Sequence, residues 1–131
     1  MRTAHGAAVL WDAHSIRSIV PRFFEGTLPD LNLGTANGES CNNVLAHKLL
    51  AIARSATGYT SVLNGRFQGG YITRNYGQPE HNIHAVQLEM TQCSYMLEAM
   101  PFDYLPNVAA GIKPTVANML KAALAFARTQ G

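Results

Sequence analysis

The chain has 131 residues, enough for one domain that could bury roughly two-thirds of its unfolded surface. Hydrophobic residues make up 47% of it and charged residues 14%, which excludes disorder of the highly charged, core-poor kind. The net charge of +2, spread over scattered basic residues, lacks the basic cluster that nucleic acids require. No apolar run approaches the roughly 20 residues of a membrane span. We therefore expect no nucleic-acid partner and no membrane.

The cysteines and the first 20 residues indicate in which cellular compartment the protein is found. Cys41 and Cys93 lack CxxC spacing, so they predict neither a disulfide framework nor a thiolate zinc site. A secretory signal peptide would need a continuous apolar stretch where this chain carries Asp12 and two histidines. We therefore expect a cytoplasmic protein.

The first 58 residues predict a strand, a long loop and a helix. Ala7–Trp11 is a continuous apolar run, typical of a strand buried on both faces in a parallel sheet, so Asp12 would follow its end. Residues Ala13–Glu39 show no sustained period and contain many Gly, Pro and Asn, which predicts a long loop. Apolar residues at helical spacing then predict a helix that Ser40 caps and that ends before Gly58.

The remaining sequence continues the alternation of strands and helices. Tyr59–Leu63 and Ile83–Met90 predict strands, and Arg66–Gly77 predicts a second irregular stretch. A loop over Pro101–Pro106 precedes a final amphipathic helix, with Pro114 in its first turn. This alternation predicts an α/β fold with a mostly parallel sheet flanked by helices.

Three groups of polar residues lie at the ends of the predicted strands or in the glycine-rich loop beyond. They are Asp12 to Ser15, Asn64 to Arg74, and Gln87 with Glu89. Because ligands of open parallel sheets bind outside the carboxyl ends of the strands, we expect these groups to converge on one cleft.

His14 and Glu89 are the candidate chemical groups of this cleft. His14 is a candidate metal ligand, with Asp12 beside it to orient the imidazole, although an ordinary, partly buried histidine fits the same pattern. Glu89 ends an apolar strand, where a carboxylate is costly unless it is paired, bound to metal or used as a base. An exposed strand terminus is the alternative interpretation for Glu89.

Four arginines fall in irregular segments: Arg17, Arg22, Arg66 and Arg74. Arginine suits two-pronged binding of a carboxylate, so a small acidic molecule is a reasonable ligand. Solvated loop arginines remain the alternative for at least two of the four.

Four motifs in order carry a resemblance to a known family. They are LWDAHSIRS at 10–18, PDLNLGT at 29–35, NGRFQGGYITR at 64–74 and VQLEM at 86–90. In this order they closely resemble the C-terminal half of the N-formylglutamate amidohydrolases, also called N-formylglutamate deformylases. The resemblance implies hydrolysis of N-formyl-L-glutamate to formate and L-glutamate in histidine degradation, by water activated on one zinc ion.

The resemblance also implies roles for particular residues. The family is similar to the zinc carboxypeptidases and aspartoacylases, so a partial fold of that kind is implied for this chain. His14 matches the third zinc ligand, with Asp12 as its neighbour. Glu89 matches the glutamate that takes a proton from the zinc-bound water and passes it to the leaving nitrogen. Arg66, Arg74 and Arg17 are the candidates that would bind the substrate's carboxylates.

The sequence departs from the family in lacking the first half, which should bring the other two zinc ligands. We therefore expect residues 1–131 to be a single partial domain, a fragment that is inactive alone and whose possible partner is the missing N-terminal half. Two alternatives stay open. One is a zinc amidase that acts on another acyl-amino acid or on a cell-wall peptide. The other is a non-catalytic remnant that pairs with the missing half or with a second copy.

Overall fold

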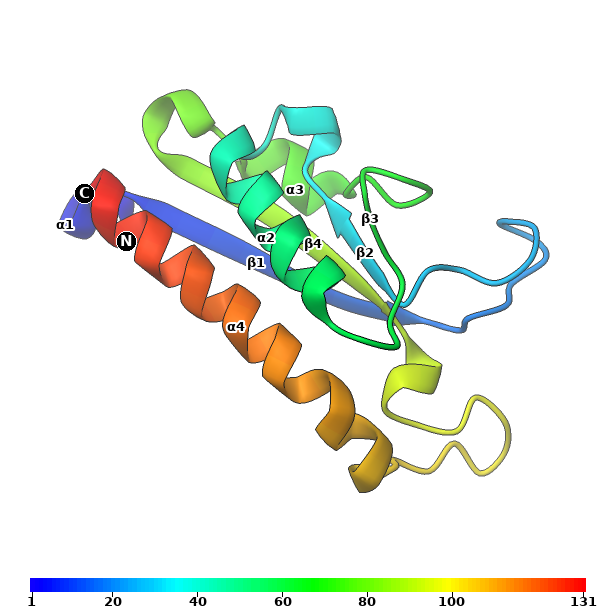
Figure 1. The fold of residues 1–131 in the computed structure, drawn as a ribbon. Helices are drawn as coiled ribbons and strands as arrows, with labels where there is room; N and C mark the ends of the chain where they lie inside the picture. The colour runs from blue at the N-terminus through cyan, green and yellow to red at the C-terminus, as the bar shows by residue number, and fades with distance from the viewer.

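The structure, a computed structural model, describes all 131 residues as a four-stranded sheet with helices on both faces (Figure 1). The two ends of the chain lie close together, since Gly131 lies against Gly6. The elements in chain order are α1 (Arg2–His5), β1 (Ala8–Ile16), β2 (Leu31–Gly34), η1 (Ala36–Gly38), α2 (Asn43–Ser55), β3 (Ser61–Leu63), α3 (Tyr71–Tyr76), η2 (Pro79–His81), β4 (Ile83–Thr91), η3 (Gln92–Ser94) and α4 (Pro106–Gln130).

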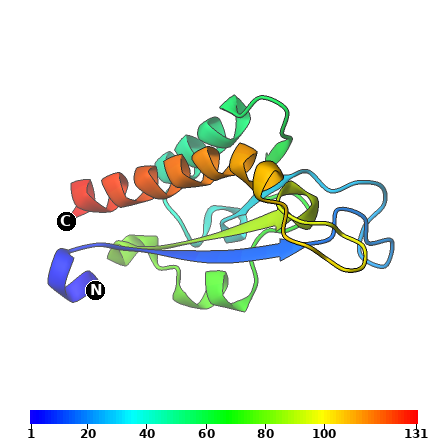
Figure 2. The ribbon, with the colours of Figure 1, turned by 90° about the horizontal axis from the view of Figure 1, so that it is seen from below.

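The sheet is mixed, with strand order β1-β4-β2-β3. β1 is parallel to β4 and β2 is parallel to β3, as expected for an α/β fold, but β2 and β4 are antiparallel. The predicted flanking by helices is confirmed. Figure 2 shows α2 and α4 on one face of the sheet and the short α3 on the other.

The core lies between the sheet and the pair α2 and α4. Leu33 and Leu88, which face each other in the register of β2 and β4, are buried there beneath Leu49 and Met119. Burying an apolar side chain of this size stabilises the fold by about 1.5–3 kcal/mol. This packing fixes which face of the sheet is apolar and leaves the α3 face for polar residues.

The first predicted strand is longer and less buried than the sequence pattern indicates. β1 runs from Ala8 to Ile16, so Asp12 and His14 lie inside the strand and not beyond its end. It occupies an edge of the sheet and is nowhere fully buried, so the prediction of burial on both faces was wrong. The continuous apolar run ends at Trp11. Asp12 and His14 then share one face of the strand, with Ala13 between them on the other face.

The predicted long loop contains β2, a strand that the sequence pattern does not predict. All four residues Leu31–Gly34 are buried, but a strand of this length is too short to show a period. The predicted helix after it is confirmed as α2, although its cap is Asn42, whose side chain accepts from the Val44 amide at 2.8 Å. Ser40 instead donates its hydroxyl to the Ala85 carbonyl at 2.8 Å.

Two further boundaries differ from the predictions. The segment predicted as irregular contains α3, and the final helix begins at Pro106 and not at Pro114. Pro106 occupies the first turn, where proline is favoured, and Pro114 lies inside the helix at the cost of one backbone hydrogen bond. The predicted strand at Ile83–Met90 is confirmed as β4, which runs one residue further, to Thr91. None of the helices combines the length and the apolar character that crossing a bilayer requires.

Candidate functional site

Four polar side chains lie together on the α3 face of β1 and β4. In the parallel register Asp12 is opposite Gln87, and His14 is opposite Glu89. Register partners project to the same face of a sheet, and the alternate residues of both strands, such as Trp11, pack into the core on the other face. We call Asp12, His14, Gln87 and Glu89 the polar row.

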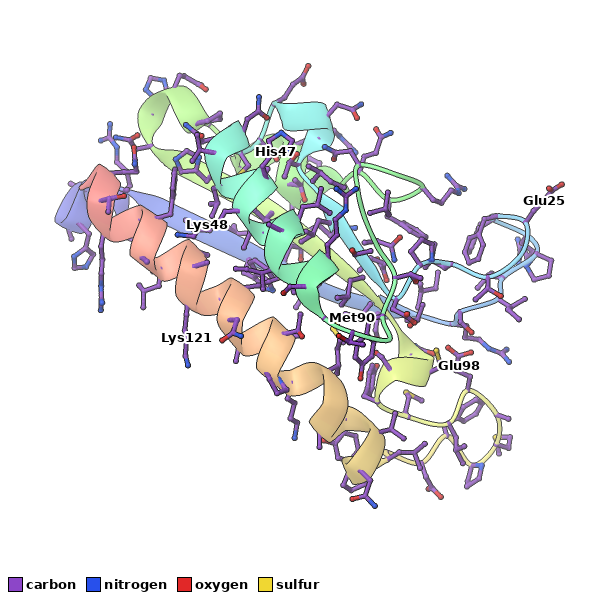
Figure 3. The ribbon with its side chains drawn as sticks, viewed as in Figure 1. Glu25, His47, Lys48, Met90, Glu98 and Lys121 are labelled. Carbon is purple, nitrogen blue, oxygen red and sulfur yellow. The ribbon has the colours of Figure 1, made fainter.

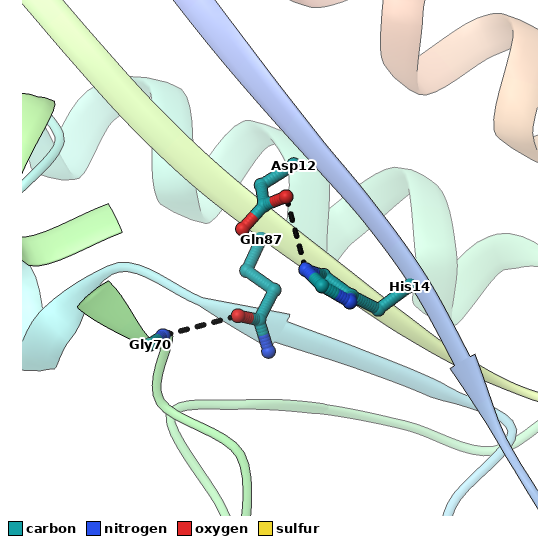
Figure 4. A network of polar contacts seen from close by, with 4 residues as sticks. All are labelled: Asp12, His14, Gly70 and Gln87. Atoms are coloured by element: carbon teal, nitrogen blue, oxygen red, sulfur yellow. Dashed lines mark hydrogen bonds and ion pairs between the residues drawn. The ribbon is translucent and has the colours of Figure 1, made fainter. Parts of the chain in front are cut away.

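His14 is oriented by Asp12 from two positions earlier in the same strand. The Asp12 Oδ1 atom lies 2.9 Å from His14 Nε2, and the His14 side chain remains 47% exposed against 13% for Asp12 (Figure 4). No residue of the chain hydrogen-bonds His14 Nδ1. A carboxylate that holds one ring nitrogen leaves the other nitrogen pointed at a ligand, as is usual for histidines that bind metal.

Glu89 is the most buried carboxylate in the chain, with 7% of its surface exposed. Burial raises the pKa of its carboxyl group above the ordinary value. The charge of His14 lowers the pKa and the charge of Asp12 raises it, both by less than the effect of burial. No residue donates a hydrogen bond to its side-chain oxygens. A carboxyl group with a raised pKa and free oxygens is suited to accept and release a proton.

A glycine-containing loop crosses the sheet beside the polar row. The Gly70 amide donates to Gln87 Oε1 at 3.1 Å (Figure 4). Gly34 in β2 allows this close approach, since a Cβ atom there would lie 2.6 Å from the carbonyl carbon of Gln68 and from the nitrogen of Gly69. The predicted Gly69-Gly70 loop and the β4 residues are thus brought together by a direct contact.

The predicted convergence at strand ends is corrected in its geometry. The polar row lies within β1 and β4 and not at their carboxyl ends. β3 runs opposite to β4, because β2 pairs parallel with β3 and antiparallel with β4. Asn64, which follows β3, binds Thr35 twice: its Oδ1 accepts from the Thr35 amide at 2.8 Å, and its Nδ2 donates to the Thr35 hydroxyl at 2.9 Å. Asn64 thus anchors the start of the glycine loop.

The three candidate arginines are exposed and are held by three different segments. Arg17 Nη2 donates to the Glu98 carbonyl at 3.0 Å, and Arg66 Nε donates to the Phe23 carbonyl at 2.8 Å. Arg74 Nη1 donates to the Gly69 carbonyl at 3.2 Å. Arg74 is therefore the arginine tied to the loop that reaches the polar row.

Two buried polar residues near this face were not singled out from the sequence. Asn32 is opposite Glu89 in the register of β2 and β4, and its Nδ2 donates to the Glu89 carbonyl at 3.1 Å. Thr73 lies in α3 beneath Gly69. The Asn32 Oδ1 and Thr73 Oγ1 atoms are buried without a hydrogen-bond partner. The one sequence signal for Asn32 is its position between two leucines, Leu31 and Leu33.

The residues of this chain do not by themselves fit a catalytic zinc ion. Such a site takes three protein ligands, and no three His, Cys, Asp or Glu side chains of the chain are grouped to hold a metal. His14, with a free ring nitrogen and an orienting carboxylate, fits the role of one ligand.

The site thus consists of a histidine-carboxylate pair beside a buried glutamate, on one face of a mixed sheet. Comparisons with known proteins identify the family that has this fold. Residues 1–96 match the N-formylglutamate amidohydrolase family. The chain belongs to this family, which confirms the resemblance carried by the four motifs.

Two curated relatives are similar over nearly the whole chain. It is 52% identical to the N-formylglutamate deformylase of Pseudomonas aeruginosa over 128 residues, which are 98% of this chain and 48% of that protein. It is 53% identical to the N-formylglutamate deformylase of Pseudomonas putida over 126 residues, which are 96% and 47%. The chain therefore spans about half the length of these relatives.

A solved structure supports the fold. The crystal structure of N-formylglutamate amidohydrolase from Ralstonia eutropha JMP134 matches with a TM-score of 0.83 at 22% identity. The match covers 99% of this chain and 48% of that one. It shows that the arrangement of the strands and helices is that of a solved member of the family.

Proposed function

We propose that this chain is part of an enzyme that hydrolyses N-formyl-L-glutamate to formate and L-glutamate in histidine degradation. Membership of the family and the names of the two Pseudomonas relatives support the reaction. The observation that carries the proposal is the burial of Glu89 beside the Asp12 and His14 pair, on the face that the glycine loop crosses.

Glu89 is proposed as the general base and then the general acid. Its carboxylate takes a proton from the water that attacks the formyl carbon. It then gives the proton to the glutamate nitrogen as the carbon-nitrogen bond breaks, which yields formate and a free amine. Its raised pKa supports both steps, because a weaker acid is a stronger base and still releases its proton to an amine.

His14 is proposed as one ligand of a single zinc ion, with the remaining ligands supplied by protein outside this chain. Asp12 holds His14 Nε2, which would leave Nδ1 to bind the metal. Bound zinc would supply Lewis-acid chemistry at the formyl carbonyl. The relation of the fold to the zinc carboxypeptidases and aspartoacylases belongs to the same proposal.

The arginines are proposed to bind the two carboxylates of the substrate. Arg74 is the strongest candidate, because its guanidinium contacts Gly69 next to the Gly70 amide that binds Gln87. Arg66 and Arg17 are weaker candidates, since their partners, Phe23 and Glu98, lie in other loops. A small acidic substrate in the cytoplasm, with no nucleic-acid or membrane partner, completes the proposal.

Formate release from N-formyl-L-glutamate tests the proposed function. The chain is mixed with a polypeptide that covers the part of the Pseudomonas aeruginosa relative that it does not match. We expect zinc-dependent formate release by the mixture and none by the 131-residue chain alone, which lacks a complete ligand set. A mixture that associates but releases no formate would contradict the proposal and favour the non-catalytic remnant.

A further inference from the structure

β1 leaves one edge of the sheet open along its whole length. It pairs with β4 over all nine residues Ala8–Ile16 and has no strand on its other side (Figure 1). Long exposed edge strands present unpaired backbone groups that template association, and proteins usually shorten or cover them. β1 is nine residues long, and no strand pairs with it at this edge.

An apolar groove of about 620 Å³ runs between β1 and the second half of α4. Leu120 and Leu124, one helical turn apart, line it and are 43% and 53% exposed. Nine of the twelve lining residues are hydrophobic, and from β1 they include Val9 and Trp11. We call this concavity the β1 groove. An apolar surface of this kind beside an open strand edge is typical of a protein interface.

The sequence of β1 is also more apolar than its position requires. Ala7–Trp11 has the pattern of a strand buried on both faces, yet in the structure residues 8–12 are only half-buried. His14 lies on the same strand, 47% exposed, in a ligand set that is incomplete. One further neighbour of β1 would cover the edge, fill the β1 groove and approach the polar row.

We propose that the β1 edge and the β1 groove bind a polypeptide that corresponds to the half of the family's chain that this protein does not match. That polypeptide adds a strand to β1 and places apolar side chains between Trp11 and Leu124. The inference rests on the proposed function for the identity of the partner, and on the open edge and groove for its place.

The lengths of the relatives decide between this partner and a second copy. The chain covers 48% of the Pseudomonas aeruginosa relative and 48% of the solved Ralstonia eutropha chain, with a TM-score of 0.83 for the latter. The family's proteins therefore hold about as much additional chain as this protein contains. A second copy would repeat the polar row already present and leave that additional half unrepresented.

The test mixes this chain with the unmatched half of the Pseudomonas aeruginosa relative. We expect a one-to-one complex by size-exclusion chromatography with light scattering, and slower hydrogen exchange of the amides of residues 8–16 in the complex. Leu124→Glu should weaken binding by about tenfold or more, because it places a charge in the interface. Val44→Glu is the matched control: Val44 is 69% exposed on α2, away from the groove, so binding should stay within about twofold.

Circular dichroism checks that each variant folds, and Leu120→Gln replaces Leu124→Glu if the latter does not. Three results would overturn the inference: absence of a complex, a complex insensitive to the folded groove variant, or a homodimer of this chain that this variant dissociates. Formate release separates this inference from the proposed function. A groove-dependent complex without activity contradicts only the function, and an active complex indifferent to Leu124→Glu contradicts only the docking site.

Discussion

Asp12 and His14 lie two residues apart on the same face of β1, with Asp12 Oδ1 2.9 Å from His14 Nε2. The contact needs no long-range packing, because alternate residues of a strand share a face. The neighbouring strand places Glu89 directly opposite His14. A local pair and one strand pairing therefore assemble the three side chains on which the proposed chemistry depends.

The first prediction concerns metal binding. The complex of this chain with the unmatched half of the Pseudomonas aeruginosa relative should hold about one zinc ion. His14→Ala should lose this ion, because three protein ligands are needed to retain catalytic zinc. Metal analysis after dialysis measures the content. His81→Ala, at a histidine that is also exposed but lies in η2, is the matched control. Zinc retained at the wild-type level in His14→Ala would remove this residue from the ligand set.

The second prediction concerns the substrate's carboxylates. Arg74→Ala in the complex should raise KM for N-formyl-L-glutamate by about tenfold or more, because a charged hydrogen-bond partner is lost. KM for an uncharged N-formyl amino acid should change much less. Arg54→Ala, on the exposed side of α2, provides the control. An equal rise of KM for both substrates would mean that Arg74 acts through the structure of its loop.

The third prediction concerns stability and pH. His84 is buried beneath Phe126, its Nδ1 accepts from the Asn42 amide, and burial lowers its pKa from the ordinary value of 6.5. The unfolded chain therefore binds a proton below about pH 6.5 that the folded chain does not, so the free energy of unfolding should fall as the pH is lowered from 7.5 to 5.5.

Urea unfolding of the wild type and of His84→Gln at these two pH values measures this contribution. The loss between pH 7.5 and pH 5.5 should be smaller in His84→Gln than in the wild type. His47→Gln, on the exposed side of α2, controls for the removal of a histidine. An identical pH dependence in the wild type and in His84→Gln would contradict the assignment.

The fourth prediction concerns the loop after β4. The Glu98 carboxylate accepts from the Ser18 amide at 2.7 Å, the Ser18 hydroxyl at 2.6 Å and the Cys93 amide at 2.9 Å. Glu98→Ala removes the acceptor of all three bonds and should lower the free energy of unfolding by about 1–3 kcal/mol. Glu25→Ala is the control, since Glu25 lies on the protruding loop in Figure 3. Equal stability of both variants, measured by urea unfolding, would mean that the Glu98 bonds contribute nothing.

The sequence predicts those elements whose pattern extends over several residues. α2 shows helical spacing over 13 residues, and β4 is a nine-residue strand with buried residues on both faces, so both are found from local pattern. β2 spans four residues and α3 spans six, which is too short for a period to appear. Their positions depend on pairing and packing with distant segments.

The candidate site can likewise be predicted from the sequence only in part. Asp12, His14 and Glu89 are identifiable from residue type and motif, but their shared face depends on the register of β1 with β4. That register depends on contacts over more than 70 residues of sequence, which no local pattern specifies. Asn32 is missed for a related reason, because its neighbour Glu89 is known only once β2 and β4 are paired.

Turnover of Glu89→Gln in the complex tests the proposed role of the buried glutamate. The substitution keeps the size of the side chain but cannot take a proton, so kcat for formate release should fall by roughly 10²- to 10⁴-fold. KM and zinc content should stay close to the wild-type values, and Glu25→Gln should behave as the wild type. Wild-type kcat in Glu89→Gln would contradict general acid-base catalysis by Glu89 and remove it from the mechanism.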